Sequence, residues 1–306
     1  MEKVIVIVGP TGVGKTALGV ALAKQLNGEV ISGDSMQIYK RMDIGTAKVT
    51  EDEMQGVVHH LIDIKEPSEE YSVTEFQETV RACIDDIVKR GKLPIIVGGT
   101  GLYIKAVLYD YTFEKCDSDP KKMEEKYKDY SNEELYERLK EVDPGATRNI
   151  HPNNRRRVLR AIEIFETTGK RKSEMEDAQR HEMIYDATCI GLTLDREKLY
   201  ERIDKRVDIM MENGLEQEVK SLIEEGCKPT YQSMRGIGYK AWFEYFEGRS
   251  SKEEVIALIK KHSRNYAKRQ FTWFNNQMMV NWYEVNVEHF EETVNKVKED
   301  LINGHE

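Results

Sequence analysis

The chain of 306 residues is poor in cysteine, which argues against several classes of protein. Its four cysteines, Cys83, Cys116, Cys189 and Cys227, are isolated in the sequence. None forms a Cys-x-x-Cys pair, and none has a histidine at metal-ligand spacing. A disulfide-stapled domain and a zinc module are therefore disfavoured, and we expect reduced, packed thiols.

Long apolar segments are also lacking. No run approaches the roughly 20 residues that a membrane span requires, and the apolar opening Met1–Val8 is too short for a secretory signal. We therefore expect a cytoplasmic protein without a membrane partner. No internal repeat is visible, and 39% hydrophobic residues suffice for one large domain or a domain carrying an insertion.

The formal net charge of -9 argues against a generic nucleic-acid binder. A polyanionic partner would have to meet local concentrations of Lys and Arg, and the chain has two. His151–Lys172 holds seven basic residues against two acidic ones, and Lys260–Arg269 holds five and no acid. In the second run, Lys260, Arg264 and Lys268 recur on one helical face. Each run is either a solvated helix face or a contact surface for nucleic acid.

The clearest positive feature is Gly9-Pro10-Thr11-Gly12-Val13-Gly14-Lys15-Thr16, between an apolar run and an amphipathic stretch. This is the spacing of a phosphate-cradling loop. The glycines let backbone N–H groups turn inward, Lys15 adds a positive charge, and the Thr16 hydroxyl can hold Mg²⁺. The following helix points its positive end at the anion. The motif predicts a polyphosphate substrate, without deciding whether a phosphoryl group is transferred or the whole diphosphate departs.

Strand and helix patterns alternate around this loop. Strands are predicted at Lys3–Val8, Glu29–Gly33 and Leu93–Val97, with helices over Lys15–Leu26 and from a capping box at Ser72 to about Arg90. This order predicts an α/β fold with a P-loop-type parallel sheet flanked by helices. Ligands of such sheets gather at the carboxyl ends of the strands, where the Gly-rich loop, Asp34 and Thr100 all fall.

The pattern changes between residues 113 and 187, where helical periods are rich in Glu, Lys and Arg and no apolar strand occurs. We expect an inserted all-helical subdomain there, which leaves 1–112 and 188–306 as the catalytic core. The core resumes with a strand at Thr188–Leu194 and a helix capped by Asp195. A last short strand at Val280–Tyr283 precedes a C-terminal helix.

P-loop proteins include kinases, hydrolases, switches and transferases, and some signatures are missing here. The strand Leu93–Val97 ends in Gly-Gly-Thr rather than in the acid that an ATPase would show. Asn295-Lys296-Val297-Lys298 does not match the guanine-reading motif of a GTPase. The acid present at a strand end is Asp34, which suits a general base. The alternative role for Asp34 is to cap a turn or orient Mg²⁺.

Seven ordered segments carry a family resemblance that runs through nearly the whole chain. They are Gly9–Thr16, Asp34–Tyr39, Ile44–Lys48, His59–Asp63, Gly98–Tyr103, Asn154–Ala161 and Lys268–Trp273. Together they resemble the bacterial tRNA dimethylallyltransferases. The resemblance implies transfer of a dimethylallyl group from dimethylallyl diphosphate to N6 of the adenosine immediately 3′ of the anticodon. Diphosphate is released, and Mg²⁺ is required.

The resemblance also implies roles at the reacting centre. Gly9–Thr16 would cradle the diphosphate, Thr100 would bond the oxygen that bridges carbon and phosphorus, and Arg206 would project toward the diphosphate. Arg202 lies one turn earlier on the same face and remains the alternative to Arg206. Asp34 is the expected base for the adenine amine.

Three further residues carry open alternatives. Lys48 either reaches a phosphate or is a solvated loop residue. The paired His59 and His60 invite a metal site, but adjacent side chains diverge and no further ligand has the required spacing.

A base stacked in an anticodon loop cannot reach a P-loop cleft, so we expect it to be extruded at a cost of a few kcal/mol. Asp34, Ser35, Met36 and Gln37 are placed to grip that base. The resemblance puts the tRNA anticodon stem-loop against Arg156, Arg157, Val158, Leu159 and Arg160, and a segment near RNA at Gln232–Tyr239. The basic run Lys260–Arg269 would also contact phosphates.

Other functions remain possible at this point. A P-loop kinase of a small metabolite would use Asp34 to deprotonate a hydroxyl, and a non-catalytic RNA-binding module would use a nucleotide as a conformational ligand. A prenyltransferase of free nucleotides is disfavoured, because AMP or ATP would give a basic helical insertion nothing to hold. We expect the protein to be a monomer.

Overall fold

The computed structural model describes residues 1–113, 120–178 and 182–304, so Cys116 lies outside the described residues. The chain forms two compact units. The core unit comprises Met1–Tyr109 and Met183–Glu306, and the insertion unit comprises Asp110–Glu182. Among the described residues, no helix is both long and apolar enough to cross a membrane.

The core unit is built on a parallel six-stranded sheet with strand order β3-β2-β4-β1-β5-β6. The strands are β1 (Lys3–Val8), β2 (Gly28–Ser32), β3 (His59–His60), β4 (Leu93–Val97), β5 (Asp186–Thr193) and β6 (Asn281–Glu284). The predicted α/β class is confirmed. β3 was not predicted, because two histidines present no apolar pattern.

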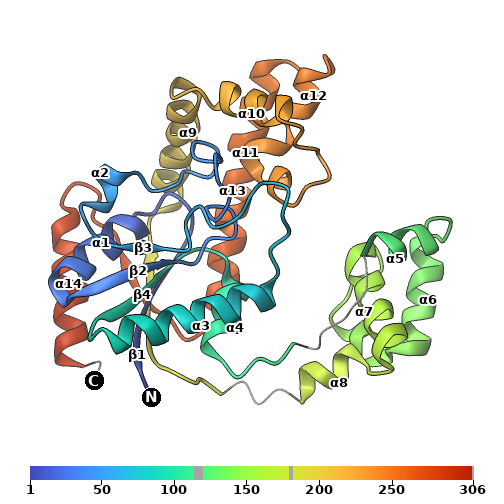
Figure 1. The fold of residues 1–306 in the computed structure, drawn as a ribbon, viewed down its shortest axis with the longest axis horizontal. Helices are drawn as coiled ribbons and strands as arrows, with labels where there is room; N and C mark the ends of the chain where they lie inside the picture. The colour runs from blue at the N-terminus through green and yellow to red at the C-terminus, as the bar shows by residue number, and fades with distance from the viewer. Residues whose placement is uncertain (114–119, 179–181, 305–306) are drawn as a thin grey trace. The chain divides into compact units, whose positions relative to one another are not determined.

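Both faces of the sheet are buried, as the apolar composition of its strands predicts. Along β1, Val4, Val6 and Val8 join one hydrophobic cluster, while Ile5 and Ile7 join the other. Helix α1 (Lys15–Leu26) packs beside β2 and β4, and α14 (Phe290–Asn303) packs against α1 and β6. On the other face, α3 (Val73–Lys89) packs against α4 (Gly101–Leu108) (Figure 1).

The rest of the core unit follows β5. Its helices are α9 (Arg196–Glu212), α10 (Leu215–Glu224), α11 (Ile237–Lys240), α12 (Trp242–Phe246) and α13 (Lys252–Gln277). Asp195 accepts the backbone N–H groups of Glu197 and Lys198 at 3.0 and 3.2 Å and begins α9, as predicted. α9 and α13 pack side by side and present residues of both helices to the carboxyl edge of the sheet.

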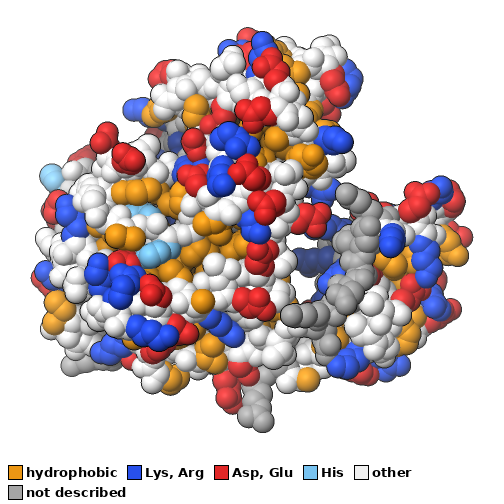
Figure 2. All heavy atoms as spheres, viewed as in Figure 1, with side chains coloured by type: hydrophobic (Ala, Val, Ile, Leu, Met, Phe, Trp, Pro, Cys, Tyr) orange, Lys and Arg blue, Asp and Glu red, His pale blue; other side chains and the backbone are white. Residues whose placement is uncertain are grey.

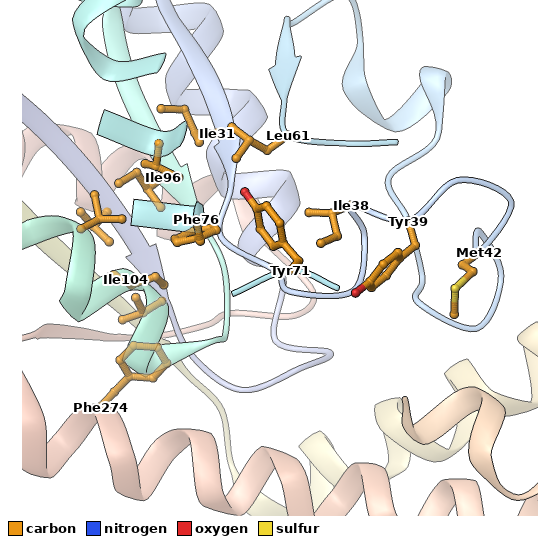
Figure 3. Packing of buried hydrophobic residues seen from close by; sticks show 14 of the residues in the cluster. Ile31, Ile38, Tyr39, Met42, Leu61, Tyr71, Phe76, Ile96, Ile104 and Phe274 are labelled. Carbon is orange, nitrogen blue, oxygen red and sulfur yellow. The ribbon is translucent and has the colours of Figure 1, made fainter. Parts of the chain in front are cut away.

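The segment between β2 and α3 is rich in polar residues and contains short α2 (Glu51–Met54) and β3. Its residues Ile38, Tyr39 and Met42 are nevertheless fully buried in the cluster that includes Ile31 and Phe76. Figure 3 shows these side chains directed into the core. Isolated apolar residues in a polar stretch have no period, so the sequence pattern did not reveal that the loop is anchored.

The insertion unit is helical and has its own core. It comprises α5 (Pro120–Lys126), α6 (Asn132–Val142), a 3-10 turn (Pro144–Arg148), α7 (Arg155–Thr168) and α8 (Lys172–Asp177). Leu135, Leu139 and Ile162 are fully buried within it.

The limits of this unit differ from the predicted range 113–187. Asp186 and Ala187 belong to β5, so the strand begins two residues before the expected Thr188. The core chain leaves at Tyr109 and returns at Met183, and these two residues pair in an antiparallel bridge.

Candidate active site

The loop Gly9–Thr16 connects β1 to α1 and has the backbone of an anion cradle. Gly9, Gly12 and Gly14 have φ angles of 141°, 83° and 110°, in the region that favours glycine. A Cβ atom on Gly9 would also lie 2.5 Å from the Leu192 carbonyl oxygen. The glycine spacing is therefore required by the turn itself, and it leaves the N-terminus of α1 open to an anion.

Gln270 of α13 holds this loop from the far end of the sequence. Its Oε1 accepts the Thr11 N–H at 2.9 Å, and its Nε2 donates to the Gly99 carbonyl at 3.0 Å. Gln270 is buried, so its amide ties the anion loop to the end of β4. The residue lies in a motif of the resemblance, but its sequence position alone gave no signal for this role.

A cavity of about 470 Å³ opens at this loop. It is lined by Thr11, Lys15 and Thr16 from the loop, by Ser32 at the end of β2 and Asp34 just after it, and by three cations of α9, Arg202, Lys205 and Arg206. Positive side chains, backbone N–H groups and a helix N-terminus converge on one space. The cavity is suited to a diphosphate.

Both candidate arginines of α9 reach the loop. Arg206 donates through Nη1 to Thr11 Oγ1 at 3.2 Å and through Nη2 to the Ala47 carbonyl at 3.4 Å. Arg202 donates through Nε to the Gly12 carbonyl at 3.0 Å. Burial lowers the pKa of Arg206. The nearby Asp34 carboxylate partly opposes this shift, because its negative charge favours the protonated guanidinium. Both arginines line the cavity, and Arg206 is the less exposed of the two. Its contact with the diphosphate stays a prediction.

Lys15 begins α1 and donates to the Pro10 carbonyl at 2.8 Å. Burial, and then the neighbouring Arg206 cation, lower the pKa of Lys15 to about 7. The ligand-free loop therefore carries a lysine that is only partly charged near neutrality.

This lowered pKa predicts a pH dependence of anion binding. Because an anion favours charged Lys15, affinity for Mg²⁺-pyrophosphate should fall as pH rises above 7, by at most about tenfold per pH unit from this group. Binding at pH 8 should take up as much as one proton, measurable by calorimetry in buffers of different ionisation enthalpy. The Lys15→Gln variant removes this contribution, and equal proton uptake in both proteins would contradict the assignment.

A second cavity of about 360 Å³ adjoins the first. Ser35, Met36, Gly236, Ile237 and Tyr239 line it, together with an apolar wall of Ile203, Val207 and Met210 from α9 and Ile259 from α13. Five residues line both cavities, namely Thr11, Asp34, Thr46, Arg206 and Tyr266. The two spaces therefore meet around Asp34.

Asp34 lies at this junction. Its Oδ1 accepts the Met36 N–H at 2.8 Å, so the residue does cap a turn. Among the described residues, no hydrogen bond engages Oδ2. The negative charge of Asp34 raises the pKa values of Lys15, Arg206 and Tyr266. Burial, and then Asp34, raise the pKa of Tyr266 to about 12, so its hydroxyl remains a donor.

Other predicted site residues are placed differently. Thr100 is absent from the lining of both cavities; its Oγ1 accepts the Ser35 N–H at 3.4 Å and contacts Tyr266. Gln37 lines the first cavity rather than the second, and its Nε2 donates to the Ala47 carbonyl at 3.1 Å. The group Asp34–Gln37 is therefore split between the two spaces.

Lys48 fits neither of its predicted roles. Its side chain is 6% exposed and its Nζ lies 2.5 Å from Asp43 Oδ1 and 2.5 Å from Asp63 Oδ1. It also donates to the Tyr39 carbonyl at 2.8 Å. The Lys48 side chain is thus buried and links Asp43, Asp63 and the Tyr39 carbonyl within the loop after β2.

The two histidines have separate surroundings. His60 Nε2 lies 2.7 Å from Glu29 Oε2. His59 lines the first cavity, its Nδ1 lies 2.9 Å from the Val57 carbonyl, and burial lowers its pKa. Residues 1–113, 120–178 and 182–304 contain no cluster of three or more His, Cys, Asp or Glu residues arranged to hold a metal.

The residues present fit Mg²⁺ as a partner of a bound diphosphate. Thr16 is exposed in the first turn of α1 and places a hydroxyl in the first cavity. A hydroxyl and waters with phosphate oxygens form the kind of oxygen site that Mg²⁺ prefers.

In the insertion unit, some of the basic side chains at the start of α7 already make contacts within the unit. Arg155 donates to the Tyr127 and Tyr130 carbonyls at 2.5 and 2.6 Å, whereas Arg156 and Arg157 are exposed. Arg160 pairs with Glu163 at 2.6 Å.

The side chains of Val158 and Leu159 are 0% and 6% exposed and pack in the core of this unit. Their side chains pack inside this unit, so we do not expect these side chains to contact RNA, and the tRNA contact at residues 156–160 stays a prediction. The helical period that exposes the arginines turns these two residues inward.

The run Lys260–Arg269 is also partly paired. Lys260 Nζ lies 2.6 Å from Asp208, and Arg264 Nη1 lies 2.5 Å from Asp204, so both tie α13 to α9. Lys268 and Arg269 are exposed, and Arg269 lines the second cavity. Figure 2 shows acidic and basic side chains interspersed on the face in view.

Comparison with known proteins agrees with this site. A family model described as IPP transferase matches residues 37–277. The tRNA dimethylallyltransferase of Bacillus cytotoxicus is 57% identical over 93% of this chain and 90% of its own length. That of Anoxybacillus flavithermus is 52% identical over 97% of this chain and 95% of its own.

Solved structures give the same result. A tRNA isopentenylpyrophosphate transferase of Staphylococcus epidermidis is 45% identical, with a TM-score of 0.74 over 99% of this chain and 100% of its own. A eukaryotic dimethylallyltransferase acting on tRNA is 32% identical, with a TM-score of 0.84 over 99% of this chain and 80% of its own. The resemblance inferred from the seven motifs is confirmed, and the chain belongs to the IPP transferase family of prenyl-transferring enzymes.

Proposed function

We propose that this protein transfers a dimethylallyl group from dimethylallyl diphosphate to N6 of the adenosine immediately 3′ of the anticodon in tRNA. The names of its relatives give the reaction class. The observation that carries the proposal is the meeting of a cationic cavity and a partly apolar one around Asp34. A donor anion and an acceptor base can be held there side by side.

The first cavity stabilises the departing diphosphate. Negative charge on the bridging oxygen grows as the allylic C–O bond breaks, and Lys15, Arg206 and the N-terminus of α1 lie where that charge develops. Mg²⁺ held through Thr16 would supply further positive charge when bound. Thr100 stays a predicted partner of the bridging oxygen; its hydroxyl would have to exchange Ser35 for the ligand.

The second cavity holds the acceptor. N6 of the adenine forms the new bond to C1 of the donor and loses one proton, which Asp34 accepts. Oδ1 stays engaged with the Met36 N–H, which fixes the carboxylate while Oδ2 takes the proton. The wall of Ile203, Val207 and Met210 offers a dry surface to the base and to the five-carbon chain.

The target base must leave its stack to enter this cavity, and the RNA around it must be held by its phosphates. Arg156, Arg157 and Arg160 of the insertion unit and Lys268 and Arg269 of α13 are exposed cations for that purpose. One chain supplies both cavities, which supports action as a monomer. We place the protein in the cytoplasm, where its tRNA substrate is found.

Replacing Arg156, Arg157 and Arg160 together by alanine should weaken tRNA binding and flatten its salt dependence by about one unit of log–log slope per lost phosphate contact. Filter binding at salt concentrations from about 50 to about 200 mM measures this effect. A matched control removes three cations with exposed side chains elsewhere in the same unit, Lys128 in the turn after α5 and Arg138 and Lys140 on α6. Equal slopes for both variants would move the RNA contact elsewhere.

Mass spectrometry of tRNA nucleosides, after incubation of unmodified tRNA with the purified protein, dimethylallyl diphosphate and Mg²⁺, tests the function. We expect N6-(dimethylallyl)adenosine at one position and stoichiometric diphosphate. No product under any Mg²⁺ condition, combined with ATP turnover in the presence of a small metabolite, would support the kinase alternative instead.

A further inference from the structure

Glu218 of α10 binds a loop of the core unit more than 170 residues away in the sequence. Its Oε2 accepts the N–H groups of Asp43 and Ile44 at 2.9 and 2.7 Å, and its Oε1 accepts the Gly45 N–H at 3.0 Å. The Tyr239 hydroxyl donates to Oε1 at 2.7 Å. Four donors thus use the full capacity of one carboxylate.

The donors are held in close packing. A Cβ atom on Gly45 would lie 2.5 Å from the Tyr239 ring, and one on Gly238 would lie 2.6 Å from the Gly45 carbonyl oxygen. Burial, and then the Glu218 carboxylate, raise the pKa of Tyr239 well above its ordinary range, so its hydroxyl stays a donor. The backbone at residues 43–45 therefore has one well-defined place against α10 and α11.

The next two residues, Thr46 and Ala47, connect the backbone of residues 43–45 to the active site. Thr46 lines both cavities, and Ala47 has a left-handed backbone with φ of 50°. The Ala47 carbonyl accepts from Gln37 Nε2 at 3.1 Å and from Arg206 Nη2 at 3.4 Å. The Ala47 carbonyl thus orients both Gln37, which lines the first cavity, and Arg206, which lines both cavities.

The loop is fixed on its other side as well. Lys48 joins Asp43, Asp63 and the Tyr39 carbonyl, and the buried Tyr39 and Met42 anchor the preceding segment in the core (Figure 3). Loss of the Glu218 contacts would therefore displace residues 43–47 locally rather than unfold the loop.

We propose that Glu218 is a positioning residue of the active site, which orients Arg206 and Gln37 through the backbone of residues 43–47. Glu218 itself lines neither cavity. Its effect on anion binding depends only on the first cavity, while its effect on turnover rests on the prenyl transfer proposed above.

The Glu218→Gln substitution keeps the size of the side chain and removes its negative charge. The glutamine amide keeps one acceptor oxygen for the N–H groups of Asp43 and Ile44, but it turns an NH₂ group toward the Gly45 N–H and the Tyr239 hydroxyl. The NH₂ group of the glutamine then faces the Gly45 N–H, so two hydrogen-bond donors oppose each other at the residue before Thr46. Glu216→Gln is the matched control, because Glu216 lies on the same helix, pairs with Lys252 at 2.7 Å and accepts a tyrosine hydroxyl, that of Tyr245, at 2.9 Å.

Two measurements that do not need tRNA test the proposal. Hydrogen exchange of the amides at residues 43–45 should accelerate in Glu218→Gln and stay at the wild-type rate in Glu216→Gln. Calorimetry with Mg²⁺ and inorganic pyrophosphate should show about tenfold weaker binding for Glu218→Gln only, the scale expected when hydrogen bonds to a charged group are lost and part of the effect reaches Arg206.

A double-mutant cycle then tests the route. If Glu218 acts through Arg206, the losses from Glu218→Gln and Arg206→Lys in pyrophosphate binding should be less than additive. Full additivity, or a Glu218→Gln variant that binds pyrophosphate like Glu216→Gln, would overturn the proposal. Absence of tRNA prenylation by the wild type, with the pyrophosphate effect intact, would instead refute the proposed function and leave the positioning role standing.

Discussion

Replacement of Asp34 by asparagine is expected to lower the single-turnover rate of prenyl transfer by about 10² to 10⁴-fold, the range for loss of a general base. Asparagine keeps an oxygen for the Met36 N–H and so preserves the turn, but it cannot take the proton from N6. Because the change is isosteric, the dissociation constant for tRNA should stay within about twofold.

Rapid quench with radiolabelled donor measures the rate, and filter binding measures tRNA affinity. Asp195→Asn serves as a control, since that residue caps α9 and lines neither cavity. A comparable loss of rate and of tRNA affinity in Asp34→Asn would refute the role as base and leave Asp34 as a turn residue that shapes the RNA contact.

Exchange of Lys15 for glutamine is expected to lower kcat/KM for dimethylallyl diphosphate by about 10² to 10³-fold, as for removal of a donor at a developing anion. The loss should fall on both kcat and KM, because Lys15 contacts an anion whose bridging oxygen gains charge toward the transition state. Steady-state kinetics at saturating tRNA separates the two effects.

Lys24→Gln provides the comparison, because Lys24 lies in the last turn of α1 and pairs with Gln55 on the surface. That variant should retain nearly full activity. If Lys15→Gln weakened tRNA binding instead and left KM for the donor unchanged, the loop Gly9–Thr16 would not be the diphosphate site.

The sequence predicted those parts of the site whose geometry is set locally. The positive φ angles of the anion loop require glycines at these positions, and Asp34 follows β2 at the strand end where ligands gather. The parallel sheet followed from apolar runs that are buried on both faces.

The supports of the site were not predicted, because each joins residues that are distant in the chain. Gln270 binds Thr11 across 259 positions, and Glu218 binds Asp43 across 175. A buried amide or a partly buried, hydrogen-bonded carboxylate on an amphipathic helix has the same periodicity as a solvated one, so only the packed structure distinguishes them. The ion pairs of Lys260 and Arg264 with α9 were missed for the same reason. The partners of Lys48 are closer in the sequence, but they lie in a loop without a periodic pattern.

The bridge between Tyr109 and Met183 bears on how such a protein can change over time. The core chain leaves at Tyr109 and returns at Met183, which are paired. The entropic cost of closing the segment between them therefore grows only slowly with the length of that segment. The helical segment carries its own hydrophobic interior, so substitutions on its outer surface leave the sheet undisturbed. Selection for different RNA partners can therefore act on that segment while the chemistry beside the glycine loop is conserved.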